Sequence, residues 1–259
     1  MAHQLRSIVG VLTLLGMTLP ASGEGGLKQP PQKITTERVN FAPGGTIHID
    51  GSYGDLNVDG WDRPEVEVTV IKTLPYGHKA KQPDQGASDL DRVRIAIEHK
   101  FPTELTISTA VPARSKPFAG GHDFHPESLV LPRKNTSGVM LEYEIHVPRD
   151  SRLAVHHGTG SVSVSGVAGD IEARVGRGDI LLWLPSGSYS VDAKTKFGIV
   201  SSDLEGAALN RYLIGERFNR LTPPPSHQLH LRMGFGGITI KEILPESEPA
   251  APDDSYLPK

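Results

Sequence analysis

The stretch 158-GTGSVSVSGVAGDIEARVGRGDILLWLPSGSYSVD-192 repeats a pattern without repeating its letters. Glycines stand at 160, 169, 178 and 187, and a short run of alternating polar and apolar residues fills each gap. Alternation with a period of two is typical of a β-strand with one buried face. Glycine suits the corners between such strands, because it adopts positive φ angles without steric cost. The stretch therefore predicts an all-β protein of short strands and glycine corners.

Two architectures fit this period. In an antiparallel β-meander or sandwich, each period would be one strand and one turn. In a single-stranded parallel β-helix, or β-solenoid, two periods would complete a coil, and successive coils would stack in parallel. The steps from Gly160 to Gly178 and from Gly178 to Gly198 are 18 and 20 residues. We favour the solenoid with these steps as coils and keep the meander as the alternative.

The solenoid predicts which residues are neighbours. Even offsets from each glycine should be buried and odd offsets exposed. Arg174 and Asp192 lie at an odd offset, five residues after Gly169 and Gly187, and both stand 14 residues after the first glycine of their coils, so they should form an outward-facing charged pair. The predicted internal contacts are Val162 with Ile180 and Val200, and Val164 with Leu182.

The rest of the chain divides by composition. MAHQLR is a positively charged start, SIVGVLTLLGMTLP is an apolar run too short for a membrane span, and ASG offers a cleavage site, which together predict a signal peptide. Long polar insertions interrupt the strands. The expected divisions are a signal peptide at 1–23, a flexible linker at 24–37, a β-solenoid domain at 38–245 with insertions at 74–92, 112–138 and 206–227, and a disordered tail at 246–259.

Composition narrows the function. The chain has 259 residues and no cysteine, which excludes disulfides, thiolate metal sites and cysteine nucleophiles. A formal charge of −3 argues against a nucleic-acid-binding protein. A second apolar run of membrane-spanning length is missing, so we do not expect an integral membrane protein. The predicted location is outside the cytoplasm, in the periplasm, at the cell surface or secreted.

Two segments carry a resemblance to a known family. They are 45-GTIHIDGSYGDLNVDGWDRPEVEVTV-70 and 143-YEIHVPRDSRLAVHHGTGSVSVSGVAGDIEARVGRGDILL-182. Their glycine-bounded strands, the G-W-D ending and the E-I-x-V-P strand resemble the exported bacterial "putative adhesin" family of unknown function, related to the head-GIN adhesin-like domains. The resemblance covers roughly residues 35–243. It implies a single-stranded β-helix and brings no catalytic residues with it.

Candidate metal and catalytic residues are scattered. The motif 122-HDFH-125 lacks the third and fourth ligands that zinc needs. His156 and His157 are adjacent in a strand and should point to opposite faces, so they cannot chelate together. We therefore expect no metal, no cofactor and no catalytic residue. The carboxylates read as turn formers rather than calcium ligands are Asp170, Asp179, Asp192 and Asp203.

The segment 181-LLWLP-185 breaks the alternation. Leu182 and Leu184 have the inward parity, so Leu181 and Trp183 should face outward. An exposed Leu–Trp pair is either covered by an insertion such as 112–138 or 206–227, or is a contact for a partner.

Three functions remain. The first is a non-catalytic, exported, adhesin-like interaction module that binds an unknown envelope protein or glycan. The second is a polysaccharide-active, lyase-like enzyme, for which we would expect carboxylates with Arg or Lys on one coil face. The third is a purely structural envelope protein. The cluster of charged residues that the lyase-like enzyme would use is Arg174, Arg177, Asp192, Lys194 and Lys196.

Overall fold

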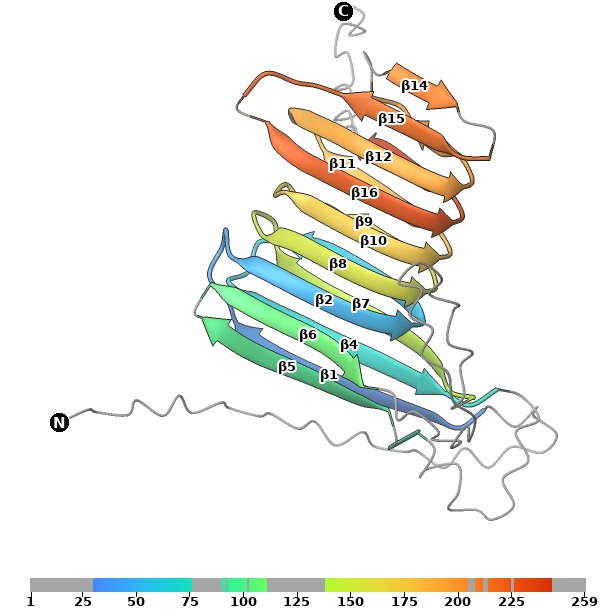
Figure 1. Cartoon of the computed structure of the whole chain (residues 1–259). Coiled ribbons are helices and arrows are strands. Elements are labelled where there is room, and N and C mark those ends of the chain that lie inside the picture. The colour runs from blue at the N-terminus through green and yellow to red at the C-terminus, as the bar shows by residue number, and fades with distance from the viewer. Residues whose placement is uncertain are drawn as a thin grey trace, which may run out of the picture.

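The computed structural model describes residues 30–75, 90–91, 93–101, 103–110, 138–204, 208–211, 214–224 and 226–243. They form seventeen strands in two sheets that face each other across one hydrophobic core, so the all-β prediction is confirmed (Figure 1). The predicted signal peptide, the 122-HDFH-125 motif, the tail and most of the insertions at 74–92 and 112–138 lie outside the described residues. The insertion predicted at 206–227 is largely described and contains two strands, Ala208–Arg211 and Glu216–Arg220.

The strands are hydrogen-bonded in an order that departs from their order along the chain. Sheet A runs β1 (Gln32–Asn40), β4 (Glu65–Thr73), β7 (Met140–Pro148), β3 (Asp55–Trp61), β9 (Val162–Ser165), β11 (Ile180–Pro185), β17 (Ile238–Ile243), β13 (Val200–Ser202). Sheet B runs β14 (Ala208–Arg211), β15 (Glu216–Arg220), β12 (Tyr189–Phe197), β16 (His227–Phe235), β10 (Ile171–Arg177), β8 (Arg152–Thr159), β2 (Thr46–Tyr53), β6 (Glu104–Ala110), β5 (Arg94–Phe101).

Both sheets are mixed. From β7 to β13 in sheet A, and from β6 to β12 in sheet B, every neighbouring pair is parallel. Antiparallel strands lie at the ends: β1 and β4 in sheet A, and β5, β15 and β14 in sheet B. Figure 1 shows the strands stacked along one axis, with β14 at one end and β1 and β5 at the other.

Five pairs of consecutive strands cross from sheet B to sheet A through a short corner. We call each pair a unit; in stacking order the units are β2–β3, β8–β9, β10–β11, β16–β17 and β12–β13. Consecutive nine-residue periods thus lie in opposite sheets. The predicted parallel contacts of Val162 with Ile180 and of Val164 with Leu182 are confirmed.

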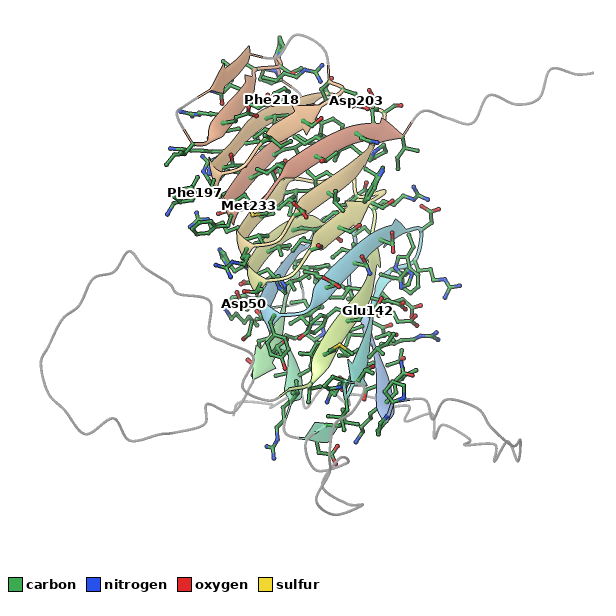
Figure 2. All side chains as sticks on the ribbon, turned by 90° about the vertical axis from the view of Figure 1, so that its right-hand side faces the viewer. Asp50, Glu142, Phe197, Asp203, Phe218 and Met233 are labelled. Atoms are coloured by element: carbon green, nitrogen blue, oxygen red, sulfur yellow. The ribbon has the colours of Figure 1, made fainter. Side chains whose placement is uncertain are left out.

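The core consists of columns of inward side chains, one from each unit (Figure 2). Alternate residues of the central strands are buried, so the predicted parity is confirmed. Because the columns stack mainly aliphatic side chains, burial is continuous along the axis. Two columns are Leu105–Ile47–Leu153–Ile171–Leu229–Val191 in sheet B and Tyr143–Leu56–Val162–Ile180–Ile238–Val200 in sheet A.

The stacking order corrects the sequence prediction at one unit. The C-terminal unit β16–β17 lies between β10–β11 and β12–β13, so Ile238 separates Ile180 from Val200. The segment 234-GFGGITI-240 repeats the glycine corner and the alternation of its neighbours. It therefore offers the same edges to both units and can stand between two units that follow each other in the chain.

The predicted pair of Arg174 and Asp192 is wrong, because β16 lies between their strands and because the register of β12 is shifted. Arg174 lies beside Arg232, and Arg232 lies beside Lys194, whereas Asp192 belongs to the neighbouring row with Glu172. The stretch from Ile180 to Val191 is two residues longer than the equivalent stretch from Val162 to Ile171, so position 174, 14 residues after Gly160, corresponds to position 194. The two residues are separated by a strand and by a row.

Five corner glycines stack on one another: Gly54, Gly160, Gly178, Gly236 and Gly198. Their φ angles lie between 109° and 145°, a region that side chains other than glycine rarely adopt. In the last four, an added Cβ would overlap the carbonyl oxygen of the preceding glycine in the stack. The corners are therefore packed backbone against backbone.

A series of backbone hydrogen bonds links successive corners, and the last corner amide bonds to a side chain instead. The amides of Val162, Ile180 and Ile238 donate to carbonyls of the next unit at 2.8–3.0 Å. Val200 belongs to the last unit, and its amide donates instead to the buried Glu216 carboxylate at 2.8 Å. Glu216 thus supplies the acceptor that a further unit would have supplied.

The first strand begins earlier than the sequence suggested. β1 pairs with β4 over its full length, from Gln32 opposite Thr73 to Asn40 opposite Glu65. Strand pairing thus includes residues 32–37, which the composition had assigned to the linker. Its side chains are almost all exposed, which explains why no alternation marked it.

We predict that Gly178→Ala destabilises the fold by about 3 kcal/mol or more, because strain at positive φ and overlap with the Gly160 carbonyl add together. Gly44→Ala is the matched control: its φ is also positive, at 78°, but nothing lies within 4 Å of an added Cβ. It should cost about 1–2 kcal/mol. Urea denaturation midpoints compare the two, and equal costs would contradict close corner packing.

Glu216→Leu should cost about 1–3 kcal/mol, because it leaves the buried Val200 amide without its acceptor. Glu216→Gln keeps an oxygen that can accept this hydrogen bond, and should therefore cost less. Hydrogen exchange at the Val200 amide provides the local readout. It should accelerate in Glu216→Leu more than in Glu216→Gln, and unchanged protection in both would remove the capping role.

Candidate functional site

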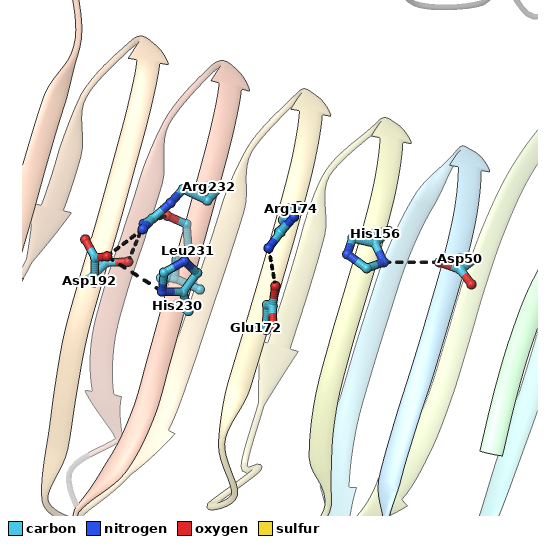
Figure 3. Close-up of polar contacts among 8 residues, drawn as sticks. All are labelled: Asp50, His156, Glu172, Arg174, Asp192, His230, Leu231 and Arg232. Carbon is cyan, nitrogen blue, oxygen red and sulfur yellow. Dashed lines mark hydrogen bonds and ion pairs between the residues drawn. The ribbon is translucent and has the colours of Figure 1, made fainter. Parts of the chain in front are cut away.

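The outer face of sheet B carries rows of charged side chains across β2, β8, β10, β16 and β12 (Figure 3). His156 lies 3.3 Å from the Asp50 carboxylate, and Arg174 lies 2.8 Å from Glu172. These side chains point outward because they alternate with buried residues along their strands. The ion pairs are exposed, so each contributes about 0–1 kcal/mol to stability.

Asp192 is the most heavily paired carboxylate on this face. It accepts hydrogen bonds from Arg232 at 2.5 Å and Arg217 at 3.2 Å, and His230 lies 3.6 Å away. Desolvation opposes ionisation of Asp192, but the hydrogen bonds and charges of Arg232 and Arg217 outweigh it and hold its pKa below the usual range. Asp192 is therefore a weak base, fixed by its partners, and the prediction that it forms a turn is wrong.

One row of this face is cationic. In register across four strands stand Arg174, Arg232, Lys194 and Arg217, with strands about 4.8 Å apart. Glu172 and Asp192 pair with the arginines. In the described part of the chain, no carboxylate lies within ion-pair distance of Lys194, nor of Lys196 two positions further along β12. Of the sequence-predicted set, Arg174 and Arg177 thus lie on β10 and Lys194 and Lys196 on β12, with β16 between these two strands.

The end of sheet B nearest the glycine corners exposes aromatic rings. Phe235 and Phe197 are register partners, and their rings stack with centroids 4.5 Å apart and planes 5° apart. The Arg177 guanidinium lies over the Phe235 ring, 5.6 Å from its centroid. The two rings are 48% and 41% exposed, and Figure 2 shows Phe197 pointing away from the sheets.

Ile199 extends the apolar surface past the corner. It is 65% exposed, and its carbonyl accepts the Ile238 amide beside Gly237. We call Arg177, Phe197, Ile199 and Phe235 the aromatic corner. Sequence reasoning missed the two rings. The signal was present, because each phenylalanine directly precedes a corner glycine, in 196-KFG-198 and 234-GFG-236.

Leu181 and Trp183 lie on the outer face of sheet A, half-buried. Leu181 stands between Ser163 and Thr239, and Trp183 stands between Ser165 and Lys241. Their outward parity is as predicted. Whether they contact a partner stays a prediction.

Three of the four predicted turn-forming carboxylates bind backbone. Asp179 accepts the Gly237 amide at 2.8 Å, Asp170 accepts the Gln228 amide at 2.9 Å, and Asp203 accepts the Glu242 amide at 3.2 Å. Each joins a unit to its neighbour. The described residues contain no group of three or more His, Asp or Glu that could hold a metal ion.

His156 and His157 point to opposite faces, as the sequence predicted: His156 is exposed and His157 is buried in the core. Nε2 of His157 hydrogen-bonds to the Gly54 carbonyl at 2.7 Å. Burial lowers the pKa of His157, and this effect outweighs the hydrogen bond to Gly54, which raises it. His157 is thus a structural residue of the corner.

No protein-family model and no curated protein matches the chain. Among solved structures, a "putative cell adhesion protein" from Clostridium sporogenes is 15% identical over 83% of this chain and 100% of its own, with a TM-score of 0.43. A "putative adhesin" from Bacteroides fragilis is 12% identical over 84% of this chain and 100% of its own, with a TM-score of 0.26. In the described residues, no helix has both the length and the apolar character to cross a membrane.

The wild-type protein should lose stability as the pH falls below about 6.5, because the unfolded chain protonates His157 there before the folded chain does. His157→Gln keeps a donor for the Gly54 carbonyl and removes the titration, so it should lose less between pH 7.5 and pH 5.5. Chemical denaturation at both pH values measures the difference. His156→Gln is the exposed control and should keep the wild-type dependence, and equal losses in all three proteins would refute the role of His157.

Proposed function

We propose that this protein is a non-catalytic, exported, adhesin-like interaction module of the bacterial envelope. The observation that carries the proposal is the aromatic corner, where stacked rings and an isoleucine are exposed on a scaffold whose other apolar side chains are mostly internal. Exposed aromatic side chains are favoured anchors in binding surfaces. The partner would be an envelope protein or a glycan.

We further propose that the two sheets are two sides of a β-solenoid, with antiparallel strands closing its ends. The parallel registers of the five units and the stack of corner glycines support this description. A solenoid presents outward residues in straight rows, because its units stack in register along one axis. Such rows suit an extended partner.

Export to the periplasm or the cell surface is part of the proposal. The charged start, the short apolar run and the ASG site of residues 1–23 support a signal peptide. The adhesin-like domain would then comprise residues 38–245 together with the whole of β1. Residues 246–259 would form a tail.

A polysaccharide-active enzyme is the weaker alternative. A general base works best with a pKa near the working pH, whereas the pKa of Asp192 is lowered and both its oxygens accept hydrogen bonds from arginines. The cationic row with Lys194 and Lys196 could bind an acidic sugar, but it lacks a poised base among the described residues. Binding without turnover is the better-supported activity.

Leu181 and Trp183 form a second proposed contact region. Both side chains are half-buried on the outer face of sheet A, beside Ser163 and Ser165 of β9. This region lies on sheet A and is independent of the aromatic corner, so the two can be tested separately.

Purified protein without residues 1–23 should retain envelope material in a pull-down from a bacterial cell-wall and membrane fraction. Phe197→Ser should weaken this capture at least about fivefold if the aromatic corner is the anchor, whereas Trp183→Ala tests the second region. Phe101→Ser, at an exposed ring of β5 far along the stack, is the matched control. Failure to capture any envelope component would overturn the proposal, and cleavage of an acidic glycan would favour the enzyme.

A further inference from the structure

The strongest unassigned feature is the meeting of the cationic row and the aromatic corner on three adjacent strands. β10 contributes Arg174 and Arg177, β16 contributes Arg232 and Phe235, and β12 contributes Lys194, Lys196 and Phe197. Two carboxylates, Glu172 and Asp192, face this surface and are held by arginines. A third, Asp179, lies at the corner and accepts the Gly237 amide.

Charge is unbalanced on this surface. Glu172 pairs with Arg174, and Asp192 is shared by Arg232 and Arg217. Arg177, Lys194 and Lys196 have no carboxylate within ion-pair distance among the described residues. The surface is therefore locally cationic in a chain whose formal charge is −3, which gives it charge complementarity with an anion.

Glycines occupy the strip of surface that lies between the cationic row and the aromatic corner. The positions two residues before the corner are Gly158, Gly176 and Gly234 in three successive units, and each lies against the backbone of the unit before it. On β10 and β16, Gly176 and Gly234 therefore leave no outward side chain between Arg174 and Arg177 or between Arg232 and Phe235, whereas β12 carries Lys196 at the corresponding position. A ligand can approach the cations and the rings at the same time along this strip.

We propose that this surface binds an acidic polysaccharide, with the chain running along the stacking axis, across β10, β16 and β12. Cations one strand apart match a linear polymer with repeated carboxylates or sulfates better than a single compact anion. The Phe197 ring ends the stack of Arg177, Phe235 and Phe197 and offers a face to the C–H surface of a sugar ring. This inference rests on the proposed binding function and names its partner.

The test is binding of polygalacturonate to the protein without residues 1–23, measured by affinity electrophoresis and calorimetry. Wild-type protein should bind polygalacturonate and not the neutral polymer dextran, and salt should weaken binding. The double variant Lys194→Gln/Lys196→Gln should lose at least about tenfold in affinity. Lys241→Gln, an exposed lysine on the opposite sheet, is the matched control and should bind as the wild type does.

Phe197→Ser tests the aromatic part. It should lower affinity for polygalacturonate by about fivefold or more and leave the salt dependence unchanged, because it removes ring contact and no charge. Phe101→Ser should leave affinity unchanged. All of these side chains are exposed, so circular dichroism and denaturation midpoints should match the wild type and separate lost binding from lost folding.

Several outcomes would overturn the inference. The first two are no binding of polygalacturonate, and equal losses of affinity in Lys194→Gln/Lys196→Gln and Lys241→Gln. The third is binding to phosphatidylglycerol vesicles alone. The fourth is concentration-dependent dimerisation that Phe197→Ser abolishes, which would make the aromatic corner a contact between two copies of the protein. If envelope capture persists while polygalacturonate binding is absent, the interaction function stands and only the acidic polysaccharide is refuted.

Discussion

The close stacking of backbone at the corner glycines is the constraint on which the rest of the structure depends. The corner amides of Val162, Ile180 and Ile238 bond to the next unit, and four of the five stacked glycines lie against the carbonyl of the preceding glycine, so a side chain there would push adjacent units apart. Since all five glycines adopt positive φ, the chain turns from sheet B to sheet A at the same place in every unit. Straight columns of core residues follow from this common turning point.

A stack of identical edges must also be closed at its ends, because unpaired strand edges invite further pairing. At one end, Glu216 reaches across to the last corner amide, and β15 and β14 add antiparallel strands with no unit beyond them. At the other end, β1 and β5 pair antiparallel with β4 and β6. The buried Lys72 ammonium there donates to the Val93 carbonyl at 2.6 Å. Burial, followed by the charge of Lys33, lowers the pKa of Lys72, consistent with a desolvated cap.

Sequence alone could predict what is local to a strand and could not predict what depends on stacking order. The parity of Val162, Val164 and Ile180 follows from alternation within one strand, so it was predictable. The place of β16–β17 was not, because its corner resembles the others and several neighbours would satisfy its edges equally. The predicted register of Asp192 was wrong because the stretch from β11 into β12 is two residues longer than the equivalent stretch from β9 into β10, and a period measured between glycines does not show this difference.

The insertion of β16–β17 is also what brings the candidate site together. Without it, Phe197 would lie next to Arg177, and Lys194 next to Arg174. With it, Phe235 stands between Arg177 and Phe197, and Arg232 stands between Arg174 and Lys194. Inward residues such as Leu229 and Ile238 pack into the core columns, while outward residues such as Arg232 and Phe235 form part of the candidate surface. Core packing and recognition therefore depend on opposite faces of the same unit, and outward residues that make no contact between units can change without disturbing the core.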